Sequence, residues 1–361
     1  MAKRSEIERK LGQMFVTGIP GTEMSPETRE FLADYQPGGV IYFAHNYDAP
    51  ALLWEYSEAI RATMQIPVIV AVDHEGGKVQ RFLRPFTHFP EPAVFGEIDS
   101  PKLAFEAAVV MARELRAVGV NLDFHPLCDI HTRPSNPVIG RRAFGTTEEI
   151  VGKMASAMVR GFMAEGMISC IKHFPGHGDT TVDSHLELPK SEESWEQLLD
   201  RELKPFIKCI KSRVDMIMTA HILNRALDPK YPVTLSREIL TGRLRGELRF
   251  QRLIITDDML MDAVAKYWGK EEMILLAIEA GADILLYRDI ESGREAMDTA
   301  LRFLSQGKIK PEWVEAAHAR IMEVKERVLM PRKPEPIEGV RIIGCPEHRQ
   351  VLDRVLEQKR R

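Results

Sequence analysis

The sequence predicts an α/β fold: a (β/α)8, TIM-like barrel in a single domain with a short C-terminal helical appendage. Two observations predict it. Short apolar runs recur along the chain, and each is followed by a polar turn and then a helical pattern, at least seven times. The runs do not alternate polar and apolar residues, and continuous apolar runs are typical of strands buried on both faces of a parallel sheet. An open, doubly wound sheet is the alternative.

Seven apolar runs are predicted as strands. The stretch before them, residues 1–15, is polar and then helical in pattern. In chain order the runs are "GGVIYF" (38–43), "IPVIVAVD" (66–73), "GVNLDFHP" (119–126), "MISCIKHF" (167–174), "VDMIMTAH" (214–221), "RLIITDD" (252–258) and "ADILLYR" (282–288).

The segments between these runs are predicted as helices. Asp48 is the expected N-cap of the segment after the first run, with Pro50 in its first turn. Ser100 and Gly119 mark the expected start and stop of another helix. Pro205 is expected to kink or restart a later one. The helical segments are 48–65, 100–119, 146–166 and 194–211.

The Pro-rich stretch "MPRKPEPIEG" (330–339) is the expected end of the barrel. We therefore predict a barrel domain over residues 1–330 and a short tail over 331–361, with a last helix near 346–360. No internal repeat and no low-complexity linker is visible in the sequence.

Composition narrows the function classes. The chain has 44% hydrophobic and 28% charged residues, a net charge of −4 and a pI of about 6.3. This balance favours neither nucleic-acid binding nor a polybasic membrane patch. No run reaches the ~18 apolar residues of a transmembrane helix, and the N-terminus lacks the apolar core of a signal peptide. Four scattered cysteines form no CxxC pair, so we expect a reduced, cytoplasmic protein whose oligomeric state the sequence leaves open.

Ionisable residues end five consecutive predicted strands. In a barrel, the carboxyl ends of the strands and the loops after them build the site. One such residue per strand can serve turn chemistry, but five in succession indicate a shared pocket. The residues are Asp73; Asp123 with His125; Lys172 with His173; His221; and Asp257 with Asp258.

The loop after His173, "FPGHGDTTVDSHLELP", is too rich in Gly, Pro, Thr and Asp for a helix and longer than a typical βα connection. Asp183 and His185 are two residues apart, so in an extended segment they point to the same side. An aspartate beside a histidine fixes its tautomer and stabilises the imidazolium, which suits acid–base chemistry. Metal binding by the whole histidine-rich set is an alternative, and a purely structural role suits His177 and Asp179.

Asp257 and Asp258 are adjacent at the end of a strand. Adjacent residues of an extended chain point in opposite directions, so only one should face the barrel axis. We assign the pocket to Asp257, and a helix cap or a supporting role to Asp258.

Several motifs together resemble glycoside hydrolase family 3, and most closely its β-N-acetylglucosaminidase (NagZ-type, peptidoglycan-recycling) branch. The similarity runs in order from about residue 10 to 330. The motifs are "VDHEGGKVQRF", "NPVIGRRAFG", "KHFPGHGDTTVDSH", "MTAHI…ALDPKYPVTLS" and "IITDDML".

The resemblance implies a retaining hydrolase on a (β/α)8-like barrel. It implies that Asp257 is the nucleophile and that Asp183 and His185 form the acid–base dyad, with the histidine in the place of the usual carboxylic acid. The residues that it implies for holding the sugar are Asp73, Arg81, Arg142, Lys172 and His173.

The expected function is therefore that of an exo-β-N-acetylglucosaminidase acting on terminal N-acetylglucosamine of muropeptide-type fragments. No metal or organic cofactor is implied, and a small-molecule glycoside is the expected partner. A β-glucosidase or β-xylosidase of the same family, a metal-dependent hydrolase using the histidine-rich loop, and a non-catalytic sugar-binding barrel are the alternatives. The sequence leaves open the natural aglycone, hydrolysis versus phosphorolysis, and the role of the tail.

Overall fold

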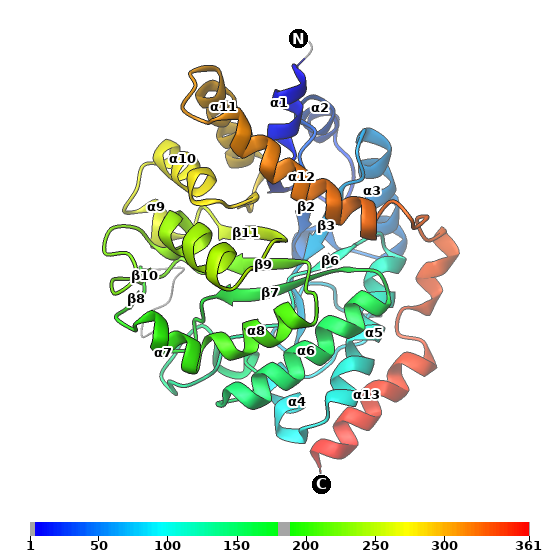
Figure 1. The fold of residues 1–361 in the computed structure, drawn as a ribbon. Coiled ribbons are helices and arrows are strands. Elements are labelled where there is room, and N and C mark those ends of the chain that lie inside the picture. Colours follow the sequence, from blue (N-terminus) through cyan, green and yellow to red (C-terminus); the bar gives the residue numbers. More distant parts are fainter. Residues whose placement is uncertain (1–3, 180–187, 361) are drawn as a thin grey trace.

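A computed structural model describes residues 4–179 and 188–360 of the chain. Within these residues, eight parallel strands close into a barrel in the order β1-β12-β11-β9-β7-β6-β3-β2, so the predicted barrel is confirmed over the open sheet (Figure 1). The strands are β1 Phe15–Gly18, β2 Gly39–Tyr42, β3 Ile69–Val72, β6 Leu122–Asp123, β7 Ile168–Phe174, β9 Met216–Thr219, β11 Leu253–Asp258 and β12 Ile284–Tyr287.

All seven predicted strands are present, and the strand absent from the prediction is β1. Its four residues, "FVTG", follow directly on the helical pattern of α1 (Glu6–Gly12), and a run this short gives little periodic signal. It closes the barrel by pairing with β2 on one side and with β12 on the other. Every residue of β1 is buried, as expected for a strand covered on both faces.

Helices surround the barrel, and the amphipathic ones turn an apolar stripe toward it. They are α2 Pro26–Tyr35, α3 Pro50–Thr63, α4 Pro92–Ile98, α5 Pro101–Ala117, α6 Glu148–Ala164, α7 Trp195–Asp200, α8 Leu203–Lys211, α9 Asp262–Ala265, α10 Lys270–Ala280, α11 Ile290–Ser305, α12 Pro311–Val328 and α13 Pro346–Lys359. The structure also has 3-10 helices at Ala44–Asn46, Gly140–Arg142, Val233–Leu235 and Ile337–Ile342, and a π-helix at Glu238–Glu247.

The predicted helix signals are mostly confirmed. Ser100 caps α5 by accepting the N–H of Leu103. Pro205 lies in the first turn of α8, where a missing N–H costs nothing, and the chain does restart there after α7. The expected cap Asp48 is wrong: the N-cap of α3 is Ala49, because Pro50 starts the helix and holds the residue before it extended.

Two small sheets lie outside the barrel. β4 (His74–Gly76) and β5 (Val79–Gln80) form an antiparallel hairpin directly after β3. β8 (Lys190–Ser191) pairs with β10 (Leu223–Asn224) and so joins the segments that follow β7 and β9. Both sheets follow strand ends and therefore belong to the face of the barrel on which the predicted site lies.

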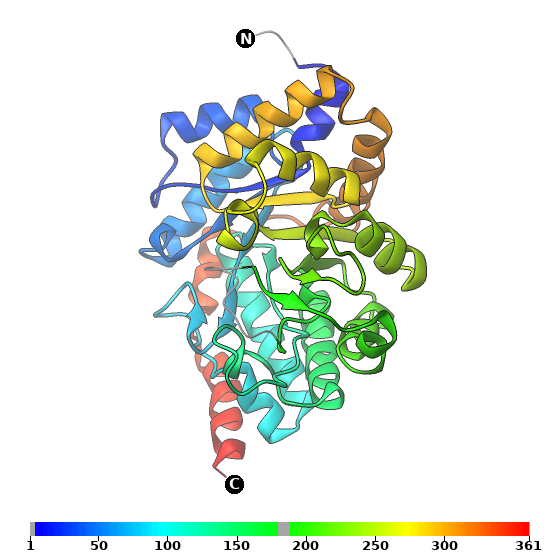
Figure 2. The ribbon, with the colours of Figure 1, turned by 90° about the vertical axis from the view of Figure 1, so that its left-hand side faces the viewer.

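The chain after α12 runs along the outside of the barrel. It passes α3 and α5 through the 3-10 turn Ile337–Ile342 and ends in α13, which packs on α4 and α5 (Figure 1). The predicted last helix, 346–360, agrees with α13 to within one residue. The turned view shows α1 and α13 at opposite ends of the molecule (Figure 2). Within residues 4–179 and 188–360, no helix combines the length and apolar character needed to span a bilayer.

Candidate active site

A cavity of about 270 Å³ opens at the carboxyl ends of the barrel strands. Its volume is just below the roughly 300–1,000 Å³ that is typical of small-molecule sites, which suits a small ligand. The cavity brings together six of the eight predicted site residues, namely Asp73, Arg81, Arg142, Lys172, His173 and Asp257. They come from five different segments of the chain, so the convergence of strand ends in the barrel assembles them.

Several charged side chains line the cavity, and we call Asp73, Arg81, Arg142 and Lys172 the charged wall. Lys172, near the end of β7, is at its centre. Its Nζ lies 2.8 Å from Oδ1 of Asp73 and 2.7 Å from Oε1 of Glu75, and only 2% of the side chain is exposed. Burial lowers the pKa of Lys172, but the two carboxylates outweigh burial and hold it above its ordinary value. Lys172 is therefore a fixed cation at the cavity wall.

Asp73 faces the cavity between two cations. Besides Lys172, its Oδ2 lies 3.4 Å from Nη2 of Arg81. Burial raises the pKa of Asp73, but Lys172 and Arg81 outweigh it, so the pKa lies below its usual value. An ionised carboxylate beside two hydrogen-bond donors matches the donor and acceptor groups of a sugar's hydroxyls.

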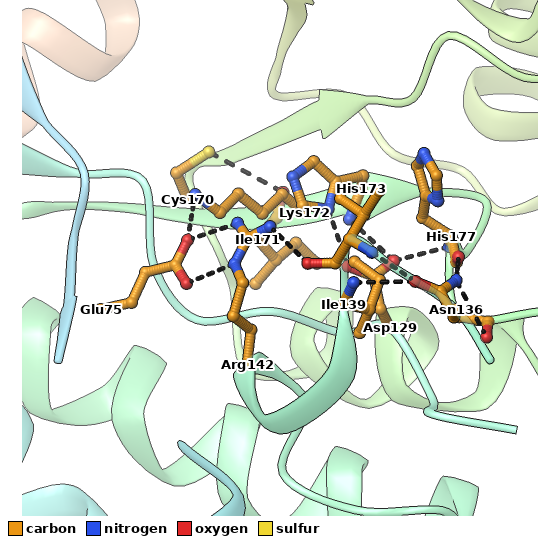
Figure 3. A network of polar contacts seen from close by, with 12 residues as sticks. Glu75, Asp129, Asn136, Ile139, Arg142, Cys170, Ile171, Lys172, His173 and His177 are labelled. Atoms are coloured by element: carbon orange, nitrogen blue, oxygen red, sulfur yellow. Dashed lines mark hydrogen bonds and ion pairs between the residues drawn. The ribbon is translucent and has the colours of Figure 1, made fainter. Parts of the chain in front are cut away.

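Glu75 is a residue that the sequence reasoning missed. It is fully buried in β4, and Arg142 binds it with both ends of the guanidinium, Nη2 to Oε1 at 2.7 Å and Nε to Oε2 at 2.9 Å (Figure 3). Burial raises the pKa of Glu75, but Arg142 and then Lys172 hold it well below its usual value. Glu75 thus fixes the guanidinium of Arg142 and the ammonium of Lys172 with one carboxylate.

Asp129 is a second missed residue, and it orders the histidines of "KHFPGH". Its Oδ2 lies 2.7 Å from Nδ1 of His173, and its Oδ1 accepts the backbone N–H of His177 at 2.7 Å (Figure 3). Because Nδ1 of His173 is held by Asp129, the ring's other nitrogen is left to the cavity side. Asn136 donates to the carbonyl oxygen of His177 at 2.8 Å and anchors the same turn.

A structural role is the prediction for both His177 and Asp179, and the structure separates the two residues. His177 lines the cavity, and burial, followed by the nearby His173, lowers the pKa of His177 to about 4. Asp179 instead forms ion pairs with Arg133 at 3.3 Å and Arg201 at 3.7 Å, away from the cavity. The structural interpretation fits Asp179 and is incomplete for His177.

Asp257, near the end of β11, faces the cavity as predicted. Its Oδ1 accepts the N–H of Asp258 at 2.8 Å. Burial raises the pKa of Asp257, but the rings of His173 and His221 and this N–H outweigh burial, so the pKa lies below its usual value. The carboxyl group is therefore ionised at neutral pH, which is the state that a nucleophile requires.

Asp258 also reaches the cavity, in contrast to the expectation that only one carboxylate of the pair would do so. The pairing of β11 with β12 shifts register between Ile255 and Asp258, and this irregularity breaks the strict alternation of side chains. Its Oδ1 accepts the N–H groups of Leu260 and Arg288, the predicted supporting role. Burial raises the pKa of Asp258 to about 6.

Asp123 and His221, two of the strand-end residues expected at the shared pocket, act by hydrogen bonding. Asp123 is buried, and its Oδ1 accepts the N–H of His74, the residue after Asp73. His221 lies between Oγ1 of Thr234 at 2.9 Å and the carbonyl oxygen of Asp258 at 3.0 Å. Each therefore holds the segment next to a cavity carboxylate.

Asp183 and His185 lie outside the described residues, so their predicted dyad has no structural account. Among residues 4–179 and 188–360, no three His, Cys, Asp or Glu side chains gather in a way that could hold a metal ion.

A larger cavity, about 450 Å³, lies between α3, α5 and the chain after α12. Its lining includes Arg61, Arg116 and Arg332, and Arg116 is already paired with Glu335. The predicted site residues line the smaller cavity instead. We therefore take the smaller cavity as the candidate active site, because of the side chains that line it and not because of its volume.

Comparison with known proteins identifies the family of the chain. The model of the glycosyl hydrolase family 3 N-terminal domain matches residues 6–324. A protein named beta-hexosaminidase from Alkalilimnicola ehrlichii is 37% identical over 293 residues, which are 80% of this chain and 83% of that protein.

Two solved structures extend the likeness. A glycoside hydrolase family 3 beta-N-acetylglucosaminidase from Paenibacillus sp. FPU-7 aligns with a TM-score of 0.93 and 34% identity, over 99% of this chain and 69% of that chain. NagZ from Neisseria gonorrhoeae, in complex with N-trifluoroacetyl-D-glucosamine, aligns with a TM-score of 0.81 and 28% identity, over 96% of this chain and 98% of that one.

Proposed function

The chain is a member of glycosyl hydrolase family 3, and we propose that it is a retaining exo-β-N-acetylglucosaminidase, a β-N-acetylhexosaminidase that removes a terminal non-reducing N-acetylglucosamine. The observation that carries the proposal is the ionised Asp257 facing a small cavity that the Asp73, Lys172 and Arg81 array also lines. The names of the similar proteins support the choice of sugar.

In the proposed first step, Asp257 attacks the anomeric carbon and forms a covalent glycosyl-aspartate, while His185 protonates the departing glycosidic oxygen. In the second step, His185 takes a proton from water while the water oxygen attacks the anomeric carbon, and the bond from that carbon to Asp257 breaks. The configuration of the anomeric carbon inverts in each of the two steps. Two inversions give net retention. Asp183 orients the imidazole and stabilises its charged form.

The sugar ring is proposed to lie between Asp257 and the charged wall. Asp73 accepts from hydroxyl groups, and Lys172, Arg81, Arg142 and His173 donate to them. Because the ions of the wall are fixed by one another in the protein alone, they need little reorganisation on binding. This preorganisation favours the transition state, in which the hydroxyl contacts strengthen.

We further propose that the enzyme acts in the cytoplasm on N-acetylglucosamine-containing muropeptides from the cell wall. The small size of the cavity supports an exo-acting enzyme. No cofactor enters this mechanism.

Two measurements test the proposal. The first compares nitrophenyl N-acetyl-β-glucosaminide with the nitrophenyl β-glucoside and β-xyloside, and we expect hydrolysis of the N-acetylated substrate by a wide margin. Preference for the glucoside or xyloside would transfer the chain to the alternative activity. Chelation by EDTA should leave the rate unchanged, whereas a loss that zinc restores would favour the metal-dependent alternative.

The second measurement traps the intermediate. A 5-fluoro derivative of N-acetylglucosamine with a good leaving group forms a glycosyl-enzyme that hydrolyses slowly, and peptide mapping locates the label. We expect the label on the peptide that contains Asp257. A label elsewhere, or inversion of configuration in the product, would contradict the mechanism. Product analysis of a muropeptide digest with and without phosphate distinguishes hydrolysis from phosphorolysis.

A further inference from the structure

A buried carboxylate outside the site joins two distant parts of the chain. Glu114, on α5, is 2% exposed. Its Oε2 accepts the N–H of Thr87 at 2.7 Å, and its Oε1 accepts the Thr87 hydroxyl at 2.6 Å. Oε1 also accepts the N–H of Gly344 at 2.8 Å and lies 2.8 Å from Nδ1 of His348. A buried carboxylate with this many donors is a fixed junction, because loss of any donor leaves buried charge less well satisfied.

Thr87 belongs to the segment 81–91, which begins at the cavity. Arg81 is its first residue, and the segment is held inside by the buried rings of Phe82, Phe86 and Phe89. It also returns to the hairpin that carries Glu75, because the N–H of Gly77 donates to the carbonyl oxygen of Phe89 at 2.9 Å. The segment is therefore the outer support of the Arg81 and Glu75 side of the cavity.

Gly344 and His348 belong to the chain after the barrel. Gly344 has a φ of +64°, and a Cβ there would overlap the carbonyl oxygen of Pro85, so the two backbones are in direct contact. His348 lies in the first turn of α13 and is 6% exposed. The C-terminal segment thus contacts the support segment twice, once directly and once through Glu114.

We propose that the C-terminal segment 337–359 is a positioning element for the sugar pocket, with Glu114 and His348 as its positioning residues. It acts by fixing the segment 81–91 and so the guanidinium of Arg81 opposite Asp73. This inference rests on the proposed function for its kinetic readout. It gives the tail a role in substrate binding in addition to its packing on α4 and α5.

The test compares His348→Ala, His348→Asn and Arg354→Ala in the full chain. Asparagine places an amide N–H where Nδ1 of histidine lies and can still donate to Glu114. Arg354 is on the same helix, and its contact is the ion pair with Glu106 at 2.9 Å, so it is the matched control. We expect His348→Ala to raise KM for the nitrophenyl N-acetylglucosaminide about fivefold with kcat within about twofold, because ground-state sugar binding is weakened. His348→Asn should restore KM, and Arg354→Ala should leave it unchanged.

Gly344→Ala is the second variant, since its added methyl group would overlap the carbonyl oxygen of Pro85 while the side chains of Glu114 and His348 are not substituted. It should raise KM in the same way. Hydrogen exchange of the amides of residues 82–91 gives a readout that needs no sugar: exchange should quicken in His348→Ala and Gly344→Ala and remain unchanged in Arg354→Ala.

Unchanged KM and unchanged exchange in both folded variants would overturn the inference, and so would an equal rise of KM in Arg354→Ala. If the wild-type protein hydrolyses no N-acetylglucosaminide, the proposed function fails while the exchange data still decide whether the tail fixes the segment. Should His348→Ala not fold, the comparison of Gly344→Ala with Arg354→Ala decides the outcome alone.

Discussion

The two ends of the barrel both hold buried carboxylates, but they use them differently. At the amino ends of the strands, Asp215 is bound by Arg252 at 2.8 Å, by Arg327 at 2.5 Å and by the hydroxyl of Ser169 at 3.0 Å. Asp283 there is bound by Arg245 at 2.6 Å and Arg320 at 2.7 Å.

At the carboxyl ends, the charged groups bind one another but also face a cavity. Lys172 is held by Asp73 and Glu75, and Asp257 is held by the N–H of Asp258, yet all but Glu75 line open space. The difference teaches that a buried carboxylate whose partners all come from the protein stabilises the fold. Charged groups that also face a cavity can bind a ligand, and in a barrel they lie at the carboxyl ends of the strands. Variants at the two ends should therefore separate activity from stability.

The largest expected effect is on activity at the carboxyl end. Asp257→Asn removes the proposed nucleophile and should lower kcat/KM by about 10⁴-fold or more, with little loss of thermal stability. Steady-state kinetics on the nitrophenyl N-acetylglucosaminide measure it. Asp262→Asn, on α9 of the same segment, is the control and should be near wild type, because its side chain is 42% exposed and its carboxylate pairs with Lys266. A loss of kcat/KM smaller than about 10²-fold would show that Asp257 is not the nucleophile.

The next effect concerns the leaving group. His185→Ala should reduce hydrolysis of substrates with poor leaving groups by about 10²- to 10⁴-fold, but should slow activated nitrophenyl substrates much less in the first step, because a good leaving group needs little protonation. A series of aryl glycosides with different phenol pKa values measures the dependence. Equal losses across the series would contradict the acid role of His185.

A smaller effect is expected on stability at the amino end. Asp283→Asn leaves Arg245 and Arg320 partly buried without their countercharge and should cost about 3 kcal/mol of unfolding free energy, with KM unchanged. Urea denaturation measures it, with Asp298→Asn as the control, because Asp298 is a carboxylate that accepts an exposed contact from Tyr35. A change in KM would mean that the two ends are coupled.

The smallest expected effect is a pH dependence at the same end. Lys325 on α12 is buried, and burial lowers its pKa to about 7 from 10.5; Nζ donates to the side-chain oxygen of Gln13 and the carbonyl oxygen of Gly38. Between these two values the unfolded chain binds the proton and the folded one does not, so stability rises with pH from about 7 toward 10.5.

Lys325→Met removes this titration. Its unfolding free energy should rise less between pH 7 and pH 9 than that of the wild-type protein, by up to about 2 kcal/mol. Denaturation curves at the two pH values measure the difference. Parallel curves for the two proteins would show that Lys325 keeps an ordinary pKa in the folded state.

The sequence was sufficient for the barrel and for the residues at the strand ends. Asp73, Lys172 and Asp257 could be grouped because parallel strands in a barrel converge at their carboxyl ends, whatever their separation along the chain. The strand β1 was not predicted, because its four residues beside a helix are too few to show a periodic hydrophobic pattern.

Glu75 and Asp129 were not predicted as site residues for another reason. Their roles depend on Arg142 and His173, which lie 67 and 44 residues away in the sequence. Nothing in the short motif "HEGG" or in "LCDIH" indicates which distant side chain the acid will meet. A rule that each buried cation at a strand end needs a buried carboxylate could have singled them out.

The pairing of β1 with β12 has a consequence for synthesis of the protein. Phe15 of β1 is synthesised before every other strand of the barrel, and its partner Leu285 belongs to the last of these strands, β12. Until β12 has emerged, one edge of β1 presents unpaired backbone groups, and such an edge invites association with other chains. The barrel therefore stays open along this edge of β1 until its last strand has been synthesised.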